Sequence, residues 1–315
     1  EAGITPRVTE TAKGFWVIYI GLTAVCTMAY GFNGMNWLDA LMHAFSTVSL
    51  GGFSSHDASF GFFDSPVLEA ITIGFALMSG ISYVTHFAAL SGRSLRPYRR
   101  DGEMPFYLGV LGTSVLLVAT YLWQQDYYAE FATALRHAAF NTVSVATTLG
   151  YASTDYSKWP FFAPLWMLFL CSFVTCSGST GGGLKMMRAV ILYKQVFREI
   201  THAMHPNAMT FVKLGGSIVP NKIILAVLGF GFLYMASTIF FTLVLAASGI
   251  DIVSAFSAAV ACFNNTGPGL GLVGPDSNYG VLNDFQVCVC SFAMLLGRLE
   301  IFTLLVVLTP AYWRK

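Results

Sequence analysis

Long apolar segments alternate with shorter, more polar ones along this chain, and the alternation restricts the fold more than any other feature. A helix that crosses a bilayer needs roughly 20 mostly apolar residues. Charged residues make up only 10% of the chain, whereas a soluble domain carries about 25%. We therefore expect an all-α integral membrane protein. The segments that are long enough to span, or nearly so, are 14–31, 66–90, 105–123, 161–199, 221–248 and 285–313.

A shorter stretch lies between the members of each pair of apolar segments, at 36–53, 128–151 and 251–269. Each of the three is too short and too polar to span, and each ends in Gly, Ser, Thr or Asn. Irregular backbone is tolerated at membrane depth only where it is buried in protein or lines a watery cavity. These stretches therefore predict re-entrant half-helices followed by extended loops, so that the order helix, half-helix, helix occurs three times.

The three loops can be aligned on one glycine each, Gly52, Gly150 and Gly267, with spacings of 98 and 117 residues. An alignment of the first two half-helices on His43 and His137 gives a register that differs by a few residues, which predicts that one half-helix is shorter. Glycine permits dihedral angles at which successive carbonyls can face one axis. The alternative is that these glycines cap helices in the ordinary way.

The distribution of Lys and Arg predicts the orientation in the membrane. Segments 91–103 and 185–222 hold ten basic residues, and both ends of the chain hold more, so this side is expected to be cytoplasmic. The opposite side carries Arg136 and Lys158 as its only basic residues. An acidic outer mouth would raise the local concentration of cations, although acids also populate any solvated loop. The acids expected there are Asp39, Asp57, Asp64, Asp126, Glu130, Asp155, Asp251, Asp276 and Asp284.

A glycine-rich run at 176–183 interrupts the fourth apolar segment. Its spacing does not fit a phosphate-binding loop, and a membrane helix rather than a strand precedes it. A flexible break at a helix end is the other interpretation from the residues alone.

Arg298 is a charged residue in the middle of the last apolar segment. A charge at that depth costs a few kcal/mol and is expected to face a cavity or a partner. On a continuous helix Glu300 would point elsewhere, so it should contact another repeat. Arg298 would add an electrostatic barrier to a cation path, or alternatively form a structural ion pair with a carboxylate such as Glu69.

Several motifs together resemble the bacterial TrkH potassium transporters of the Trk/Ktr/HKT superfamily, over essentially the whole chain. The motifs are STVSLGGFSSHD, NTVSVATTLGYASTDY, FNNTGPGLGLVGP, GSTGGGLK and LLGRLEIFTLL. The resemblance implies four helix, pore-loop, helix repeats around a pseudo-fourfold pore like that of a potassium channel, the first repeat preceding Glu1. The implied parts are a connector (1–13), the second repeat (14–90), a basic cytoplasmic loop (91–104), the third repeat with a broken second helix (105–199), a connector (200–220) and the fourth repeat (221–315).

The same resemblance implies which residues would act on the ion. Backbone carbonyls would bind K⁺ in a filter, and a gate would lie beneath it in the membrane. The implied carbonyls are those of Leu50, Gly51, Thr148, Leu149, Asn265 and Thr266, beside the filter glycines Gly52, Gly150 and Gly267. The implied gate is Gly178, Ser179, Thr180, Gly181, Gly182 and Gly183 together with Arg298.

The expected function is inward potassium transport across the bacterial inner membrane, with the pore loops facing outside and no enzymatic activity. K⁺ would be the cargo, and no organic cofactor is expected. The resemblance implies a homodimer, a cytosolic nucleotide-binding regulatory subunit of the TrkA type and contact with membrane lipid, but no nucleic acid. A proton- or sodium-coupled carrier with a midplane site and a non-conducting sensor or scaffold are the alternatives.

Overall fold

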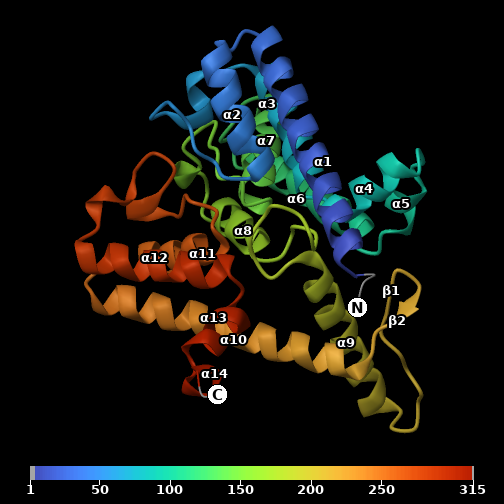
Figure 1. Cartoon of the computed structure of the whole chain (residues 1–315). Helices are drawn as coiled ribbons and strands as arrows, with labels where there is room; N and C mark the ends of the chain where they lie inside the picture. Colours follow the sequence, from blue (N-terminus) through green and yellow to red (C-terminus); the bar gives the residue numbers. More distant parts are fainter. Residues whose placement is uncertain (1–3, 314–315) are drawn as a thin grey trace. The chain divides into compact units, whose positions relative to one another are not determined.

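The computed structural model describes residues 4–313, and almost all of the regular structure there is α-helical (Figure 1). The chain divides into two compact units, Glu1–Thr154 with Thr175–Gly181, and Asp155–Val174 with Gly182–Lys315. The division falls within the expected third repeat. By length and composition, the described part holds three helices able to cross a membrane, or up to five if each of two bent pairs is one span.

The first unit contains two of the expected half-helices among longer helices. A short 3-10 helix, η1 (Ser59–Phe62), follows the first of them. Its helices are α1 (Ile4–Phe32), α2 (Trp37–Ser49), α3 (Pro66–Ser79), α4 (Tyr83–Ser91), α5 (Arg96–Arg100), α6 (Met104–Gln124) and α7 (Phe131–Ala146).

The second unit contains the remaining half-helix, α11 (Ile252–Asn264), between α10 (Asn221–Ala247) and α12 (Asp284–Arg298). Strands β1 (Lys213–Leu214) and β2 (Ser217–Ile218) pair antiparallel as a small hairpin. Its other elements are η2 (Tyr156–Lys158), α8 (Phe162–Cys171), α9 (Met186–Met204), η3 (Gly271–Val273), η4 (Tyr279–Val281), α13 (Ile301–Leu308) and α14 (Pro310–Trp313).

Each of the three short stretches singled out in the sequence contains a short helix: α2, α7 and α11. α2 and α11 have 13 residues each and α7 has 16, which explains why the histidine and glycine alignments differ in register. Side chains satisfy free N–H groups at the start of a helix. Asn36 caps α2 by accepting from the N–H of Leu38 at 3.2 Å, and Asp251 caps α11 by accepting from the N–H of Ser254 at 3.0 Å.

The segment 66–90, expected as one apolar span, is broken between α3 and α4, which meet at 89°. A chain break in an apolar setting leaves backbone groups that need partners. Two of them are satisfied from the glycine-rich segment of the same unit. The N–H of Cys176 donates to Gly80 O at 3.0 Å, and the N–H of Tyr83 donates to Gly178 O at 3.1 Å.

The segment 285–313 is likewise broken, and α12 and α13 meet at 110°. The expectation that Arg298 lies in mid-helix is therefore wrong, because Arg298 is the last residue of α12. Glu300 follows with a φ of 60°, a conformation that cannot continue a right-handed helix. Its carboxylate pairs with Arg188 at 2.9 Å, on α9, in the segment expected to be the third repeat.

The connector expected at 1–13 lies partly outside the described residues. From Ile4 onward the chain is helical and continuous with the first apolar segment. Pro6 falls in the first turn of α1, where a missing N–H removes no helical hydrogen bond. The polar residues that follow contain no helix breaker, so the helix begins earlier than expected.

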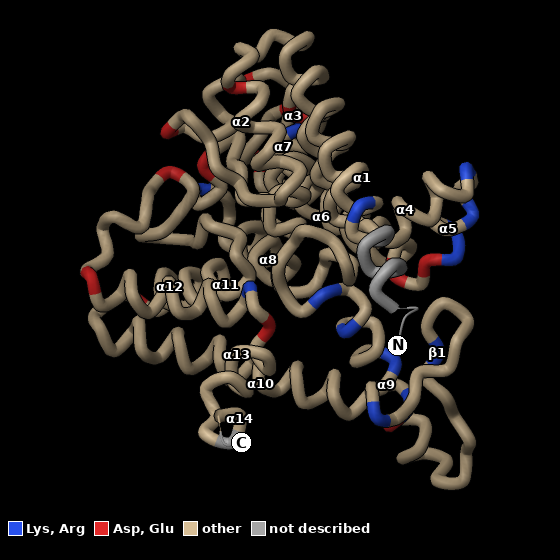
Figure 2. Tube along the Cα trace, viewed as in Figure 1, with Lys and Arg blue, Asp and Glu red and all other residues tan. Residues whose placement is uncertain are grey.

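Charged residues are unevenly distributed within each unit (Figure 2). In the first unit, Phe87 of α4 packs on Phe15 near the start of α1, and α4 leads to the arginines of α5. Asp39 lies in the first turn of α2, just after the end of α1. The arginines of α5 and the carboxylate of Asp39 therefore lie near opposite ends of α1.

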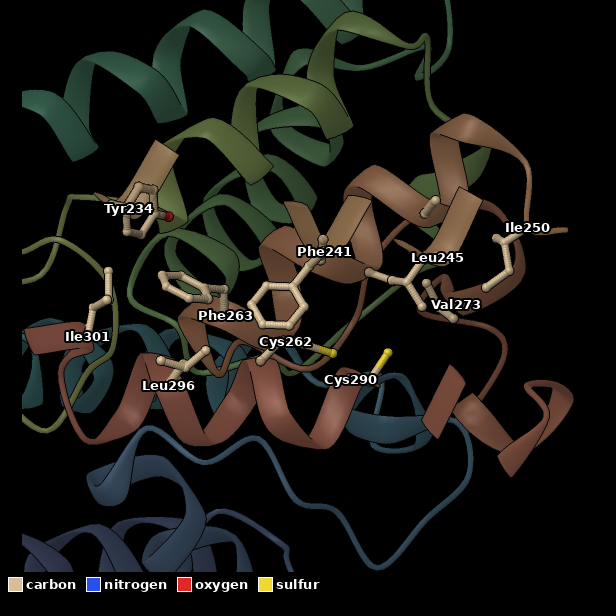
Figure 3. Close-up of a cluster of buried hydrophobic side chains, with 14 of the residues drawn as sticks. Tyr234, Phe241, Leu245, Ile250, Cys262, Phe263, Val273, Cys290, Leu296 and Ile301 are labelled. Carbon is tan, nitrogen blue, oxygen red and sulfur yellow. The ribbon is translucent and has the colours of Figure 1, made fainter. Parts of the chain in front are cut away.

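The core of the second unit surrounds α11 (Figure 3). Phe241 of α10 and Leu296 of α12 pack on the two sides of this half-helix, and Phe263 of α11 lies between them. The sulfur atoms of Cys262 and Cys290 point toward one another in Figure 3. The six cysteines are all free thiols, and five of them are buried.

Candidate functional site

The three half-helices end in the same backbone motif. A non-glycine residue in the left-handed region closes each helix, namely Leu50 (φ 54°), Thr148 (φ 61°) and Asn265 (φ 55°). The next residue donates its N–H to a carbonyl five positions back: Gly51 to Ser46 O at 2.8 Å, Leu149 to Ser144 O at 2.8 Å and Thr266 to Ala261 O at 2.9 Å. This is the hydrogen-bond pattern of a Schellman cap.

The aligned glycines do not cap these helices, so the ordinary capping interpretation is wrong. Each glycine follows its left-handed residue by two positions and has a positive φ of its own. The values are 69° at Gly52, 88° at Gly150 and 98° at Gly267. Side chains rarely tolerate this conformation. All three loops thus have positive φ at the same two positions, in the register predicted from the glycines.

Five backbone carbonyls in the loops accept no hydrogen bond within the described residues: those of Leu50, Gly51, Leu149, Asn265 and Thr266. Thr266 and Leu149 are buried in the chain, at 3% and 0% exposure. Unpaired carbonyls in such surroundings are costly unless something else supplies the positive partner.

Two of the loops touch within the first unit. A Cβ built on Gly52 would overlap the carbonyl oxygen of Leu149 and lie 3.1 Å from the Cα of Gly150. The first and second loops therefore approach through their glycines, at the residues predicted to bind the ion. The loop at Gly267 belongs to the second unit, where nothing lies within 4 Å of the Cβ position.

The electrostatics of the half-helices favour a cation at their C-terminal ends, where the helix dipole is negative. A carboxylate lies at the opposite end of each: Asp39 in α2, Glu130 before α7 and Asp251 before α11. The Ser55 hydroxyl donates to Asp39 and, with His56, lowers the pKa of that carboxyl. Hydrogen bonds from Ser254 lower the pKa of Asp251. Both groups are therefore charged at neutral pH and stabilise the positive ends of α2 and α11.

Hydroxyl groups hold the two loops of the first unit to their half-helices. Ser46 Oγ accepts from the N–H of Phe53 at 2.6 Å, and Ser144 Oγ donates to Tyr151 O at 2.6 Å. The Tyr151 hydroxyl donates to Phe53 O at 3.2 Å and to His43 O at 3.3 Å. Tyr151, which is fully buried, therefore links one loop to the other.

The glycine-rich segment is irregular, as expected, between the end of α8 and the start of α9. Within the first unit, the Thr180 hydroxyl donates to Val48 O, near the end of α2, at 3.1 Å. A Cβ on Gly181 would lie 3.0 Å from Thr147 O, at the end of α7. This part of the segment therefore contacts the C-terminal carbonyls of both half-helices in its unit.

The rest of the glycine-rich segment belongs to the second unit and is just as closely packed. A Cβ on Gly182 would overlap the carbonyl oxygen of Asn264, the last residue of α11. Gly183 has a φ of 84°, and its Cβ position is 2.7 Å from Ser172 O. Glycine is needed at both positions because the backbones approach so closely.

Arg298 follows a glycine that packs on the end of α11. A Cβ on Gly297 would overlap Phe263 O and lie 3.3 Å from the Asn265 side chain. The alternative considered from the sequence, an ion pair between Arg298 and Glu69, is wrong, because Glu69 pairs with Arg136. Arg298 is exposed in the described chain and lies next to the base of the loop at Gly267.

Sequence reasoning missed Tyr151, the ion pair of Arg136, and the docking of Thr180. These depend on residues far apart in the chain, and no local spacing marks them. His86 is an interior residue with two hydrogen bonds, to the Tyr98 hydroxyl at 2.7 Å and to Met78 O at 2.9 Å.

Comparison with known proteins identifies similar chains. A family described as TrkH, cation transport protein, matches residues 2–315. The Trk system potassium uptake protein TrkH of Salmonella typhimurium is 45% identical over 310 residues, covering 98% of this chain and 64% of the relative. The protein of the same name from Halomonas elongata is 45% identical over 316 residues, covering 100% of this chain and 65% of the relative.

A solved structure has the same fold. The crystal structure of the potassium transporter TrkH from Vibrio parahaemolyticus matches with a TM-score of 0.93 and 41% identity, covering 100% of this chain and 67% of that chain. The present chain thus spans just under two thirds of the length of the curated relatives.

Proposed function

The chain belongs to the TrkH family of cation transport proteins, and from that premise we propose that it forms three repeats of a four-repeat potassium uptake pore. The observation that carries the proposal is the shared loop geometry. Three half-helices end in the same cap, followed by a glycine of positive φ. Among the described residues, the carbonyls of Leu50, Gly51, Leu149, Asn265 and Thr266 accept no hydrogen bond. The function is transport rather than catalysis.

The proposed ligands are the carbonyl oxygens of the two residues before each glycine. They are Leu50 and Gly51, Thr148 and Leu149, and Asn265 and Thr266. A dehydrated K⁺ exchanges its water for such oxygens, and backbone carbonyls supply them without a fixed negative charge that would bind the ion too tightly. The aligned dipoles of the half-helices add attraction.

The proposed gate is the segment Gly178–Gly183 together with Arg298. The packing of this segment on the C-terminal carbonyls of the half-helices supports the assignment, since movement there would alter the path below the filter. The glycines allow the segment to pack closely, and the Thr180 hydroxyl donates to Val48 O at 3.1 Å. The guanidinium of Arg298 would repel cations from the same region.

The proposed setting is the bacterial inner membrane, with the loops outside. Relatives named as parts of a Trk system support a TrkA-like cytosolic nucleotide-binding subunit as a partner. A homodimer and surrounding lipid complete the proposed assembly, and no nucleic acid is involved. K⁺ is the cargo.

Rubidium flux tests the proposed function. The full-length protein, including the residues that precede this chain, is reconstituted in liposomes loaded with K⁺, and ⁸⁶Rb⁺ uptake is followed. We expect uptake that K⁺ inhibits and that persists without a proton or sodium gradient. Strict dependence on either gradient would favour a coupled carrier, and absence of flux a non-conducting sensor.

Replacement of Arg298 by alanine is expected to raise basal Rb⁺ uptake severalfold, because the substitution removes a positive charge from the cation path. Arg198→Ala is the matched control, since Arg198 lies on α9 and bonds Asn221 at 2.9 Å. Unchanged or lower uptake by a folded Arg298→Ala protein would refute the barrier.

A further inference from the structure

The loop at Gly267 lacks both groups that fasten the other two loops to their half-helices. In the first unit each brace uses a serine six residues before the glycine, Ser46 or Ser144, and the backbone of the residue just after the glycine. The corresponding positions around Gly267 are Ala261 and Pro268. Alanine carries no hydroxyl.

Proline carries no backbone N–H. The bond that Ser46 accepts from Phe53 therefore has neither a donor nor an acceptor around Gly267. The bond that Ser144 donates to Tyr151 O has lost its donor. Both absences follow from residue chemistry and hold however the loop packs.

The hydroxyl that bonds to this loop belongs to a residue that follows the glycine in the sequence, whereas Ser46 and Ser144 precede theirs. Tyr279, in η4, donates its hydroxyl hydrogen to Gly267 O at 2.8 Å. The Cys262 thiol of α11 lies 3.7 Å from the same hydroxyl and donates to it. The hydroxyl thus has a donor on one side and an acceptor on the other, which fixes its direction.

The backbone around Tyr279 is itself held in place. The Asn278 side chain caps η4 by accepting from the N–H of Gly280 at 2.9 Å. The N–H of Leu282 donates to Tyr279 O at 3.1 Å. Tyr279 therefore presents its hydroxyl from an ordered turn rather than from a free loop.

We propose that Tyr279 is the positioning residue of the loop at Gly267, in place of the serine used by the other two loops. Its hydroxyl donates a hydrogen bond to the Gly267 carbonyl and fixes the direction of that carbonyl. The preceding carbonyls, of Asn265 and Thr266, are then left to face the ion. The inference rests on the proposed function, and it adds that the Gly267 carbonyl is held from the outer segment after the filter. Ser257 of α11 holds the loop farther on, where it accepts from the N–H of Leu270 at 2.9 Å.

Selectivity is the property that this brace would govern, because the number and direction of carbonyl dipoles decide which ion is preferred. A loop that loses the hydrogen bond from Tyr279 would sample other carbonyl directions. Na⁺, which is smaller, would then compete better with K⁺, while the rest of the fold stays intact.

The test uses Tyr279→Phe in the full-length protein, a change that keeps the ring and its packing. ⁸⁶Rb⁺ uptake into liposomes is measured against increasing K⁺ or Na⁺. We expect the preference for K⁺ over Na⁺ to fall by about fivefold, the ratio that corresponds to one hydrogen bond. Tyr193→Phe, on the exposed face of α9, is the matched control and should leave the preference unchanged.

A rescue separates positioning from general stabilisation. In Ala261→Ser combined with Tyr279→Phe, the new hydroxyl can donate to Pro268 O as Ser144 donates to Tyr151 O, so the preference for K⁺ should recover. Recovery of selectivity supports the proposal. A conducting Tyr279→Phe protein with wild-type selectivity overturns it, as does a loss that Ala261→Ser fails to reverse. Absence of flux in the wild type would instead overturn the proposed function.

Discussion

Gly52→Ala is expected to abolish potassium-inhibited Rb⁺ uptake by the full-length protein. Two effects act together. An alanine at a φ of 69° is strained, and its Cβ would overlap the carbonyl oxygen of Leu149 in the neighbouring loop. The left-handed conformation alone costs about 1–2 kcal/mol, or roughly a factor of ten. The overlap with backbone must be relieved by moving one of the proposed ligands.

Gly74→Ala is the matched control. Gly74 lies within α3 in the same unit, and nothing lies within 4 Å of its Cβ position. Alanine is favoured over glycine in a helix, so uptake should be unchanged. Normal uptake and selectivity in Gly52→Ala would show that the loop does not line the path.

Arg136→Met is expected to have the largest effect on stability. Arg136 makes a bidentate pair with Glu69, with Nε to Oε2 at 2.9 Å and Nη2 to Oε1 at 2.8 Å. Glu69 is only 3% exposed, so the substitution would leave its charge buried and without a counterion. Breaking such a pair costs about 3 kcal/mol or more. Thermal unfolding of the purified protein in detergent should show a lower midpoint.

Two further variants make this prediction specific. Glu69→Gln in the Arg136→Met background removes the buried charge and should recover much of the loss. Lys158→Met breaks an exposed pair with Asp155, in which Lys158 is 69% exposed, and should cost at most about 1 kcal/mol. Equal destabilisation by Arg136→Met and Lys158→Met would be inconsistent with a strong buried pair.

The positions of the pore segments could be predicted because their signals are local. A stretch too short and too polar to span, followed by a glycine, predicts a half-helix and a loop from chemistry within about 20 residues. The structure has α2, α7 and α11 at those places, with glycines of positive φ in the predicted register. The non-glycine caps could not be predicted, because Leu50 and Thr148 are poor candidates for the left-handed region.

The breaks in the segments 66–90 and 285–313 could not be predicted for a related reason. Hydropathy averages over a window and does not register a single residue of positive φ such as Glu300. Its conformation is coupled to an ion pair with Arg188, 112 residues away. The break after Ser79 similarly depends on hydrogen bonds with the glycine-rich segment.

The sequence by itself determined that this chain is a helical membrane protein with three short helices, each followed by a loop with a glycine of positive φ, because apolar length, polarity and glycine act through the local backbone. Only the tertiary structure decided which groups brace the loops and which carboxylate Arg136 takes. Those choices depend on distances between residues that are far apart in the chain. Tyr279 and Gly267 show the difference: both are visible in the sequence, but their hydrogen bond exists only once the chain has folded.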